Sequence, residues 1–299
     1  MTSLLLKSLA LTATAFFLNA ASADLVPSFS TVTTGPSQAS ATWYTDRYAP
    51  AGFANVGTQF GRSDVLGIDI KSADRQGSRP PAYGGGFYNT QGRKYDVTAT
   101  GVVTASADLY VFSDWRSATD SGYRRTDMWG TLTTGNSLAP VDASFVYPII
   151  GFSNFGGAAR FRGWDSDVGW VDFGATVDFN AWNTLTFEFN PLAGTVKYFV
   201  NGVLQYTDSA LTQANSSFGP VQQIENVMLQ AFNFNNAYDV GNVFGNAPGQ
   251  LQANPAAGYD YTALWSNTLD ATAVPEPGTI VLVGLALIGA ARTARRRVH

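Results

Sequence analysis

The chain has 299 residues, with 18 lysines and arginines against 22 aspartates and glutamates, no cysteine, and one histidine, His299. The lack of thiols and of any internal imidazole excludes disulfides, Cys–His and Ser–His–Asp nucleophiles, and the usual zinc, copper and haem sites. Metal binding is then limited to oxygen ligands, calcium first, and acid–base catalysis to Asp, Glu, Tyr, Lys and Arg.

The N-terminal segment has the three regions of a secretory signal peptide. Lys7 closes a short basic region, and residues 8–20 are mostly apolar. Ala21 and Ala23 supply the small residues of a cleavage site, so residues 1–23 are predicted to form a signal helix that is removed. The alternative is a buried N-terminal helix.

Residues 24–271 are expected to form one all-β domain. Gly, Asn, Ser and Thr are abundant, and Glu188 and Glu225 are the only glutamates in this region. This composition disfavours helices and favours strands joined by elaborate loops. Strands are predicted at residues 40–44, 65–70, 105–112, 127–133, 145–152, 159–164, 169–173, 184–190, 195–200, 203–206, 226–234 and 260–267.

One predicted hairpin carries a candidate ligand-binding face. Arg160, Arg162 and Trp164 alternate along a strand and therefore share one face. A five-residue loop would place Trp164 opposite Trp170, and Arg162 opposite Asp172. Indole rings can stack on sugars while Arg and Asp bind hydroxyl or acidic groups, so these five residues are candidate carbohydrate ligands. The alternative is a solvated sheet face with an aromatic pair and an Arg162–Asp172 ion pair.

The turn of this hairpin is a candidate calcium site. Asp165 and Asp167 are two residues apart, and carboxylates at that spacing in a turn can converge on Ca²⁺. The alternative is two aspartates that bond to their own backbone and shape the turn. A second oxygen-rich loop contains Asn233, Asn235, Asn236 and Asp239 but lacks the acidic residues of a lectin metal loop.

Residues 182–206 give the clearest antiparallel signal. Leu185, Phe187 and Phe189 alternate with polar residues, which indicates a half-buried strand. Further along, Asn201-Gly202 favours a type I′ hairpin turn because both residues tolerate positive φ. Two hairpins in this passage predict an antiparallel sheet.

The same passage resembles the concanavalin A-like, laminin G-like jelly-roll superfamily. The shared pattern, W-x-x-x-x-F followed by G-x-V-x-Y-x-N-G, is carried by Trp182, Phe187, Gly194, Val196, Tyr198, Asn201 and Gly202. The resemblance implies an antiparallel jelly-roll β-sandwich. It leaves the activity open, because the superfamily holds lectins, adhesion modules, glycosidases and lyases.

A glycosidase would need two carboxylates flanking the scissile bond. The laminarinase-type relatives of this fold carry them in a Glu-x-Asp-x-x-Glu strand, which this sequence lacks. Glu188 stands alone and is expected to be a solvent-facing strand residue. The sequence therefore favours a protein without catalytic residues, although a lyase using Arg, Lys or Tyr stays open.

The C-terminal segment, residues 272–299, combines a proline-flanked motif, a short apolar run and a basic end. The motif is Val274, Pro275, Glu276 and Pro277, and the basic end contains Arg292, Arg295, Arg296 and Arg297. Arginines are costly to move across lipid, so they hold that end in the cytoplasm. A membrane helix is expected at about residues 278–294. The alternative is an ordinary single-pass tail anchor.

This segment resembles the PEP-CTERM sorting signal of Gram-negative bacteria that make extracellular polysaccharide. The resemblance implies an exosortase-type protease as a processing partner, anchoring in the inner membrane before processing, and final release or attachment at the cell surface. Without the two end segments, residues 24–273 keep 13 basic and 21 acidic side chains, a net charge of −8. Such an acidic body argues against nucleic acid as a partner.

Together these features predict an exported cell-surface or matrix protein that associates with carbohydrate or exopolysaccharide without catalysis. No cofactor is assigned, and Ca²⁺ is the first candidate for the oxygen ligands that the sequence offers. The alternatives are a polysaccharide-degrading glycosidase or lyase on the same fold, and a purely structural surface protein.

Overall fold

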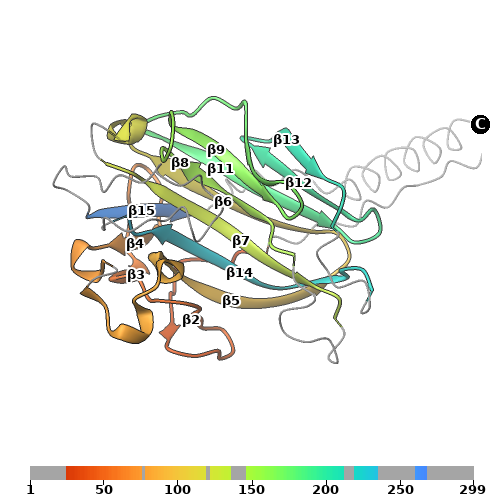
Figure 1. Ribbon diagram of the computed structural model, residues 1–299, viewed down its shortest axis with the longest axis horizontal. Coiled ribbons are helices and arrows are strands. Elements are labelled where there is room, and N and C mark those ends of the chain that lie inside the picture. Colours follow the sequence, from red (N-terminus) through yellow and green to blue (C-terminus); the bar gives the residue numbers. More distant parts are fainter. Residues whose placement is uncertain are drawn as a thin grey trace, which may run out of the picture.

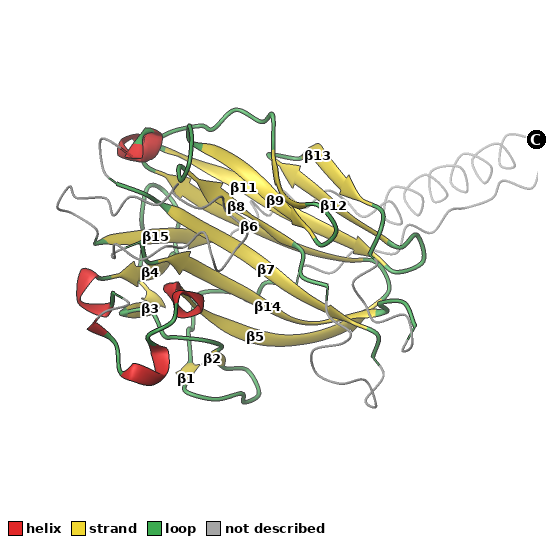
Figure 2. Cartoon of the chain, in the orientation of Figure 1, coloured by secondary structure: helices red, strands yellow, loops and turns green. Residues whose placement is uncertain are grey.

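The computed structural model describes residues 25–75, 78–118, 122–135, 146–211, 219–234 and 260–267, and within them nearly all regular structure is β-strand (Figure 2). The strands are β1 (Thr34–Gly35), β2 (Trp43–Thr45), β3 (Gly52–Asn55), β4 (Leu66–Ile70), β5 (Thr90–Thr100), β6 (Val103–Val111), β7 (Arg125–Thr133), β8 (Ile149–Ser153), β9 (Arg160–Asp165), β10 (Gly169–Asp172), β11 (Ala181–Asn190), β12 (Thr195–Val200), β13 (Val203–Asp208), β14 (Gln223–Phe232) and β15 (Tyr261–Ser266). Short 3-10 helices are η1 (Ser72–Asp74), η3 (Pro81–Tyr83), η4 (Gly86–Asn89) and η5 (Ser113–Arg116).

The described strands form two sheets that pack face to face (Figure 1). The larger sheet has the order β1-β2-β5-β14-β7-β8-β9-β10, and the smaller has the order β13-β12-β11-β6-β15-β4-β3. All neighbours are antiparallel except β1 and β2. The body is thus the two-sheet sandwich that the resemblance to concanavalin A-like jelly rolls implies.

The core lies between the sheets and is built by strict alternation. In β11, Leu185, Phe187 and Phe189 are fully buried while their sequence neighbours are half-buried. From the larger sheet, Phe161 and Leu229 are buried in the same cluster. A strand's side chains alternate between faces, so the remaining residues of the larger sheet's strands lie on its outer face.

The three predicted hairpins, β9–β10, β11–β12 and β12–β13, are confirmed. β12 joins β13 through Asn201 and Gly202, with φ values of 50° and 76°, as a type I′ turn requires. In the β9–β10 hairpin, Trp164 pairs with Trp170 and Arg162 with Asp172, in the predicted register.

Three strands, β1, β3 and β5, were not predicted; β5 is eleven residues long, but its residues are mostly polar. Several predicted strands begin two to four residues away from the observed ones, and the largest difference is in β8. The strand expected from residue 145 begins at Ile149 instead. Pro148 lacks the N–H needed for a regular ladder, and of the two described residues before it Val146 forms an isolated bridge with Leu132.

Both predicted terminal helices, the signal cleavage site and the basic tail lie outside the described residues. Among the residues that are described, no helix is both long enough and apolar enough to cross a membrane.

Candidate functional site

The outer face of the larger sheet carries a row of large side chains. Strand register aligns Met228 of β14, Trp129 of β7, Ile149 of β8, Trp164 of β9 and Trp170 of β10. Neighbouring strands lie about 4.8 Å apart, so these side chains meet although they come from distant parts of the sequence. They form an apolar cluster separate from the main core.

A second row on the same face, displaced by two residues along each strand, is polar. It aligns Gln230, Asp127, Gly151, Arg162 and Asp172. The glycine is required, because a Cβ at position 151 would collide with the side chain of Asp127 and with backbone. The missing side chain leaves room for the Asp127 carboxylate.

Two adjoining pockets open on this face, and we call them the double pocket. The larger has a volume of about 280 Å³ and includes Arg47, Lys94 and Glu225 in its lining. The smaller, of about 130 Å³, is lined by Arg125, Ile149 and the indoles of Trp164 and Trp170. Both share Trp129 and Tyr147, so the double pocket runs along the tryptophan row.

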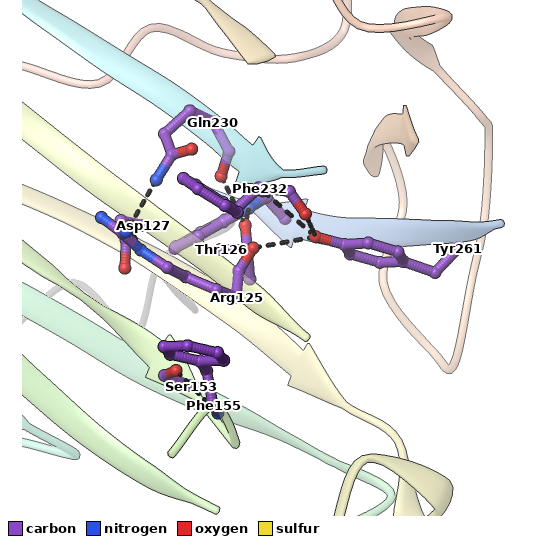
Figure 3. A network of polar contacts seen from close by, with 9 residues as sticks. Arg125, Thr126, Asp127, Ser153, Phe155, Gln230, Phe232 and Tyr261 are labelled. Atoms are coloured by element: carbon purple, nitrogen blue, oxygen red, sulfur yellow. Dashed lines mark hydrogen bonds and ion pairs between the residues drawn. The ribbon is translucent and has the colours of Figure 1, made fainter. Parts of the chain in front are cut away.

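Asp127 is the centre of a buried polar network at the smaller pocket (Figure 3). Its Oδ2 atom accepts a hydrogen bond from Arg125 Nε at 2.6 Å and another from the Gln230 amide. Its side chain is fully buried, and its Oδ1 atom has no hydrogen-bond partner among the described residues. The carboxylate therefore holds Arg125 in place at the pocket wall.

The network continues into the backbone of the neighbouring strands. The Tyr261 hydroxyl lies 2.9 Å from the Arg125 carbonyl and 2.8 Å from the Phe232 carbonyl, as Figure 3 shows. Burial raises the pKa of Tyr261 well above its ordinary value, so this hydroxyl stays protonated and donates. It ties β15 to β14 and β7 across the sandwich.

Arg162 is buried beside the double pocket without being part of its lining. Its guanidinium carbon lies 3.9 Å from the centroid of the Trp170 ring, and the side chain is 6% exposed. Burial, together with the positive charges of Arg125 and Arg160, lowers its pKa to about 9. Even so, the guanidinium remains charged at neutral pH.

Arg47 closes the opposite end of the double pocket. Its guanidinium carbon lies 4.3 Å from the ring centroid of Phe87 and 4.7 Å from that of Trp129. Its Nε is 3.4 Å from Asp46 Oδ2, and its Nη1 is buried without a hydrogen-bond partner among the described residues. The indole N–H of Trp129 is likewise buried and without such a partner.

The structure places the five residues of the predicted hairpin face together, but the Arg162–Asp172 ion pair of the alternative reading does not form. Asp172 pairs with Arg160, whose Nε lies 2.7 Å away, and not with Arg162. Trp164 and Trp170 are half-buried, with rings 5.2 Å apart in an edge-to-face contact, and not a solvated pair. Their role in ligand binding stays a prediction.

Sequence reasoning missed most of the double pocket. Its missed residues are Arg47, Lys94, Arg125, Trp129 and Tyr147, together with Asp127 behind the wall. Arg125, Asp127 and Trp129 reach the predicted hairpin through the pairing of β7 with β8 and of β8 with β9, and Lys94 of β5 lies on the far side of β14. The pairing order of distant strands leaves no local signal in the sequence.

Asp165 and Asp167 are joined by a third carboxylate, Asp208 at the end of β13. Oxygens of the three lie within 4.8 Å of one another. Asp165 Oδ1 accepts the backbone N–H groups of Asp167 at 2.7 Å and Val168 at 2.9 Å, the turn-shaping role of the alternative reading. Its Oδ2 accepts from the Tyr206 hydroxyl at 2.6 Å.

The donor set of this cluster suits calcium only in part. Carboxylate oxygens are the ligands Ca²⁺ prefers, but six to eight are usual, and both oxygens of Asp165 already accept hydrogen bonds. Burial raises the pKa of Asp208, and the charges of Asp165 and Asp167 add to the shift. Calcium binding here stays a prediction.

Two further candidates have structural partners. Asn233 is fully buried and donates to the Lys71 carbonyl at 3.1 Å and to Gln91 Oε1 at 3.2 Å. Its predicted loop companions Asn235, Asn236 and Asp239 lie outside the described residues. Glu188 pairs with Lys197 across the β11–β12 hairpin at 3.5 Å and is partly exposed, as expected of a surface strand residue.

Comparison with known proteins identifies the tail. Residues 273–297 match the family model described as the PEP-CTERM protein-sorting motif, which confirms that sequence prediction. The motif implies export and exosortase-mediated sorting to the cell surface. No curated protein matches the chain.

Solved structures with a similar body include a sialidase, the Bacillus licheniformis β-glucanase and the Caenorhabditis elegans galectin LEC-6. Their sequence identities are 13%, 15% and 19%, and their TM-scores are 0.38, 0.37 and 0.25. The matches cover 75%, 75% and 46% of this chain, and 16%, 89% and 87% of the respective structures. The chain thus spans only a small part of the sialidase, and at such low similarity no activity is transferred from these proteins.

Proposed function

We propose that this protein is a carbohydrate-binding protein of the cell surface or extracellular matrix, which holds polysaccharide in the double pocket without cleaving it. The observation that carries the proposal is the row of Trp129, Trp164 and Trp170 along the floor of two adjoining pockets. Ligand sites are usually concave, lined by aromatic side chains, and supplied with a few polar groups that orient the ligand.

The chemistry of the lining supports a sugar. Tryptophan rings offer flat apolar surfaces to the C–H faces of pyranoses. Arg47 and Glu225 in the larger pocket supply donors and acceptors for hydroxyl groups. A row of tryptophans that crosses several strands suits an extended polymer better than a compact ligand.

The carboxylates of the site favour binding over hydrolysis. Asp127 holds Arg125 and Gln230, so one of its oxygens is already engaged by two donors. Asp46 is paired with Lys94 at 2.6 Å. A glycosidase needs one carboxyl group free to protonate the leaving oxygen and a second on the other side of the bond.

The tail completes the proposal. We infer that the C-terminal segment, residues 272–299, holds the protein in the inner membrane until an exosortase removes it. The body, about residues 24–271, would then reach the polysaccharide outside the cell.

The direct test is a glycan array on residues 24–271 with three variants. Trp164→Ala and Trp170→Ala should each weaken binding about tenfold or more, because aromatic anchors dominate such interfaces. Trp182→Ala is the matched control, since Trp182 is a half-buried tryptophan on the smaller sheet. Equal binding by all three variants, or no binding by the wild type, would reject the proposal.

A reducing-end assay and an assay for unsaturated products on the same ligands separate binding from catalysis. The proposal expects neither product. Release of new reducing ends would favour the glycosidase alternative, and unsaturated ends would favour the lyase.

A further inference from the structure

Among the residues that the structure describes, the charges around the smaller pocket do not cancel. Three guanidinium groups, those of Arg125, Arg160 and Arg162, lie near two carboxylates, those of Asp127 and Asp172. The two carboxylates are already engaged. Asp127 accepts from Arg125 at 2.6 Å, and Asp172 pairs with Arg160 at 2.7 Å.

Arg162 is therefore left without an ion pair of its own, although the charges of Asp127 and Asp172 act on it from a distance. No hydrogen bond or ion pair of its guanidinium group occurs among the described residues, and its Nε is buried without a partner. Its main contact is the Trp170 ring at 3.9 Å. A buried cation normally has a paired anion, because leaving it alone costs free energy.

This charge lies close to the smaller pocket. Trp170 lines that pocket and contacts both Arg162 and Arg125, whose guanidinium carbon lies 4.6 Å from the same ring. In a partly buried site a unit charge acts over several ångströms with little screening. The smaller pocket thus combines an apolar aromatic wall with a local excess of positive charge.

The positive charge at the smaller pocket is opposite in sign to the net charge of the body. Residues 24–273 carry a net charge of −8, so the surface as a whole repels acidic polymers. The arginine without an ion pair beside the smaller pocket attracts acidic groups at that pocket. The larger pocket offers no comparable excess, because Arg47 and Lys94 there face Asp46 and Glu225.

We propose that the smaller pocket selects an acidic group of the bound polysaccharide, a carboxylate or a sulfate, and that Arg162 supplies the selecting charge from behind the pocket wall. This inference rests on the proposed function. Arg125 is the residue of the wall that faces the acidic group, and Arg162 is a positioning charge that does not line the pocket.

Because Arg162 does not line the pocket, its charge can be removed while the pocket walls stay in place. Arg162→Met keeps an unbranched side chain against Trp170 and removes the charge. Arg162→Lys retains the charge. Lys197→Met is the matched control, because it deletes one positive charge from the exposed face of β12, on the other sheet.

The experiment measures the affinity of residues 24–271 for polygalacturonate, dextran sulfate and neutral dextran, at low and at moderate salt. The wild type should bind at least one acidic ligand more tightly than neutral dextran. Preference for polygalacturonate would identify the group as a carboxylate, and preference for dextran sulfate would identify it as a sulfate. Arg162→Met should lower the ratio of acidic to neutral affinity about tenfold and weaken its salt dependence. Arg162→Lys and Lys197→Met should keep the ratio of the wild type.

Three results would overturn the inference. Equal wild-type affinity for acidic and neutral glycans would contradict it, as would an equal loss for both in Arg162→Met; in either case the proposed function stands. Absence of any glycan binding would overturn both. The melting temperature is a separate readout: it should not fall in Arg162→Met, since no hydrogen bond is lost, and a large fall would assign Arg162 a structural role instead.

Discussion

Asp127 shows how a single residue links stability to the site. It is fully buried and is the carboxylate partner of Arg125, which is itself 5% exposed. Removing one partner of a buried ion pair leaves the other charge without compensation. Asp172, which pairs with Arg160, is 54% exposed and is the natural comparison.

We expect Asp127→Ala to lower the free energy of unfolding by about 3–5 kcal/mol. Asp172→Ala should cost less than about 1 kcal/mol, because water screens an exposed pair. Urea denaturation of residues 24–271 measures both. Similar losses in the two variants would mean that the Asp127 network is not the buried anchor described above.

Asp208 predicts a pH dependence with a definite sign. Burial raises its pKa in the folded state, so the folded protein binds this proton more tightly than the unfolded chain does. The free energy of unfolding must then fall as the pH rises from the unfolded-state pKa through the folded-state pKa. Asp208→Asn should melt at a higher temperature than the wild type at pH 7, and the gain should vanish below about pH 3.

The same variant tests whether Ca²⁺ binds to the cluster of Asp165, Asp167 and Asp208. If the ion binds, Ca²⁺ should raise the melting temperature of the wild type, and Asp208→Asn should lose most of that increase. A wild-type melting temperature that is identical in Ca²⁺ and in chelator would remove calcium from the account.

Residues close in sequence were the ones that could be predicted. The alternation of Arg160, Arg162 and Trp164, with an odd loop length, was enough to pair Trp164 with Trp170. Arg125 and Trp129 were out of reach, because they join this group through strand pairing across β8. The partner of Asp172 was also out of reach, since rotamers decide between Arg160 and Arg162.

At the level of elements, predictability followed apolar alternation. β11 and β12 have it, and both were found with nearly correct ends. β5 was missed because its central residues are only half-buried, so selection for apolar side chains is weak there. It nevertheless pairs with β14 over most of its length and carries Lys94, which lines the larger pocket.

Gly151 gives a prediction about how β8 packs against β7. A Cβ at this position would meet the Asp127 side chain and the Thr126 backbone, neither of which can easily move. We expect Gly151→Ala to lower the free energy of unfolding by about 1–3 kcal/mol, as overpacking does. Gly174→Ala is the control, because nothing lies within 4 Å of the added Cβ. Equal stability of the two variants would show that β8 can shift without cost.

For the whole molecule, the sequence indicates where the protein is sorted, and the structure shows which surface it presents there. The Val274–Pro277 motif implies the destination, and it could be read directly from the order of residues. The sandwich presents a surface for work at that destination, and that surface depends on the packing of strands far apart in the chain. Absence of thiol and internal imidazole restricts the chemistry from the start.

The sorting motif and the tryptophan row together predict that the exported protein is retained on extracellular polysaccharide through Trp129, Trp164 and Trp170. The measurement is the distribution of the protein between the polysaccharide fraction and the medium of its host, for the wild type, the Trp164→Ala/Trp170→Ala double variant and Trp182→Ala. We predict that all three are exported and processed, and that only the double variant is lost from the polysaccharide fraction to the medium. Retention of the double variant at the level of the wild type would contradict the account.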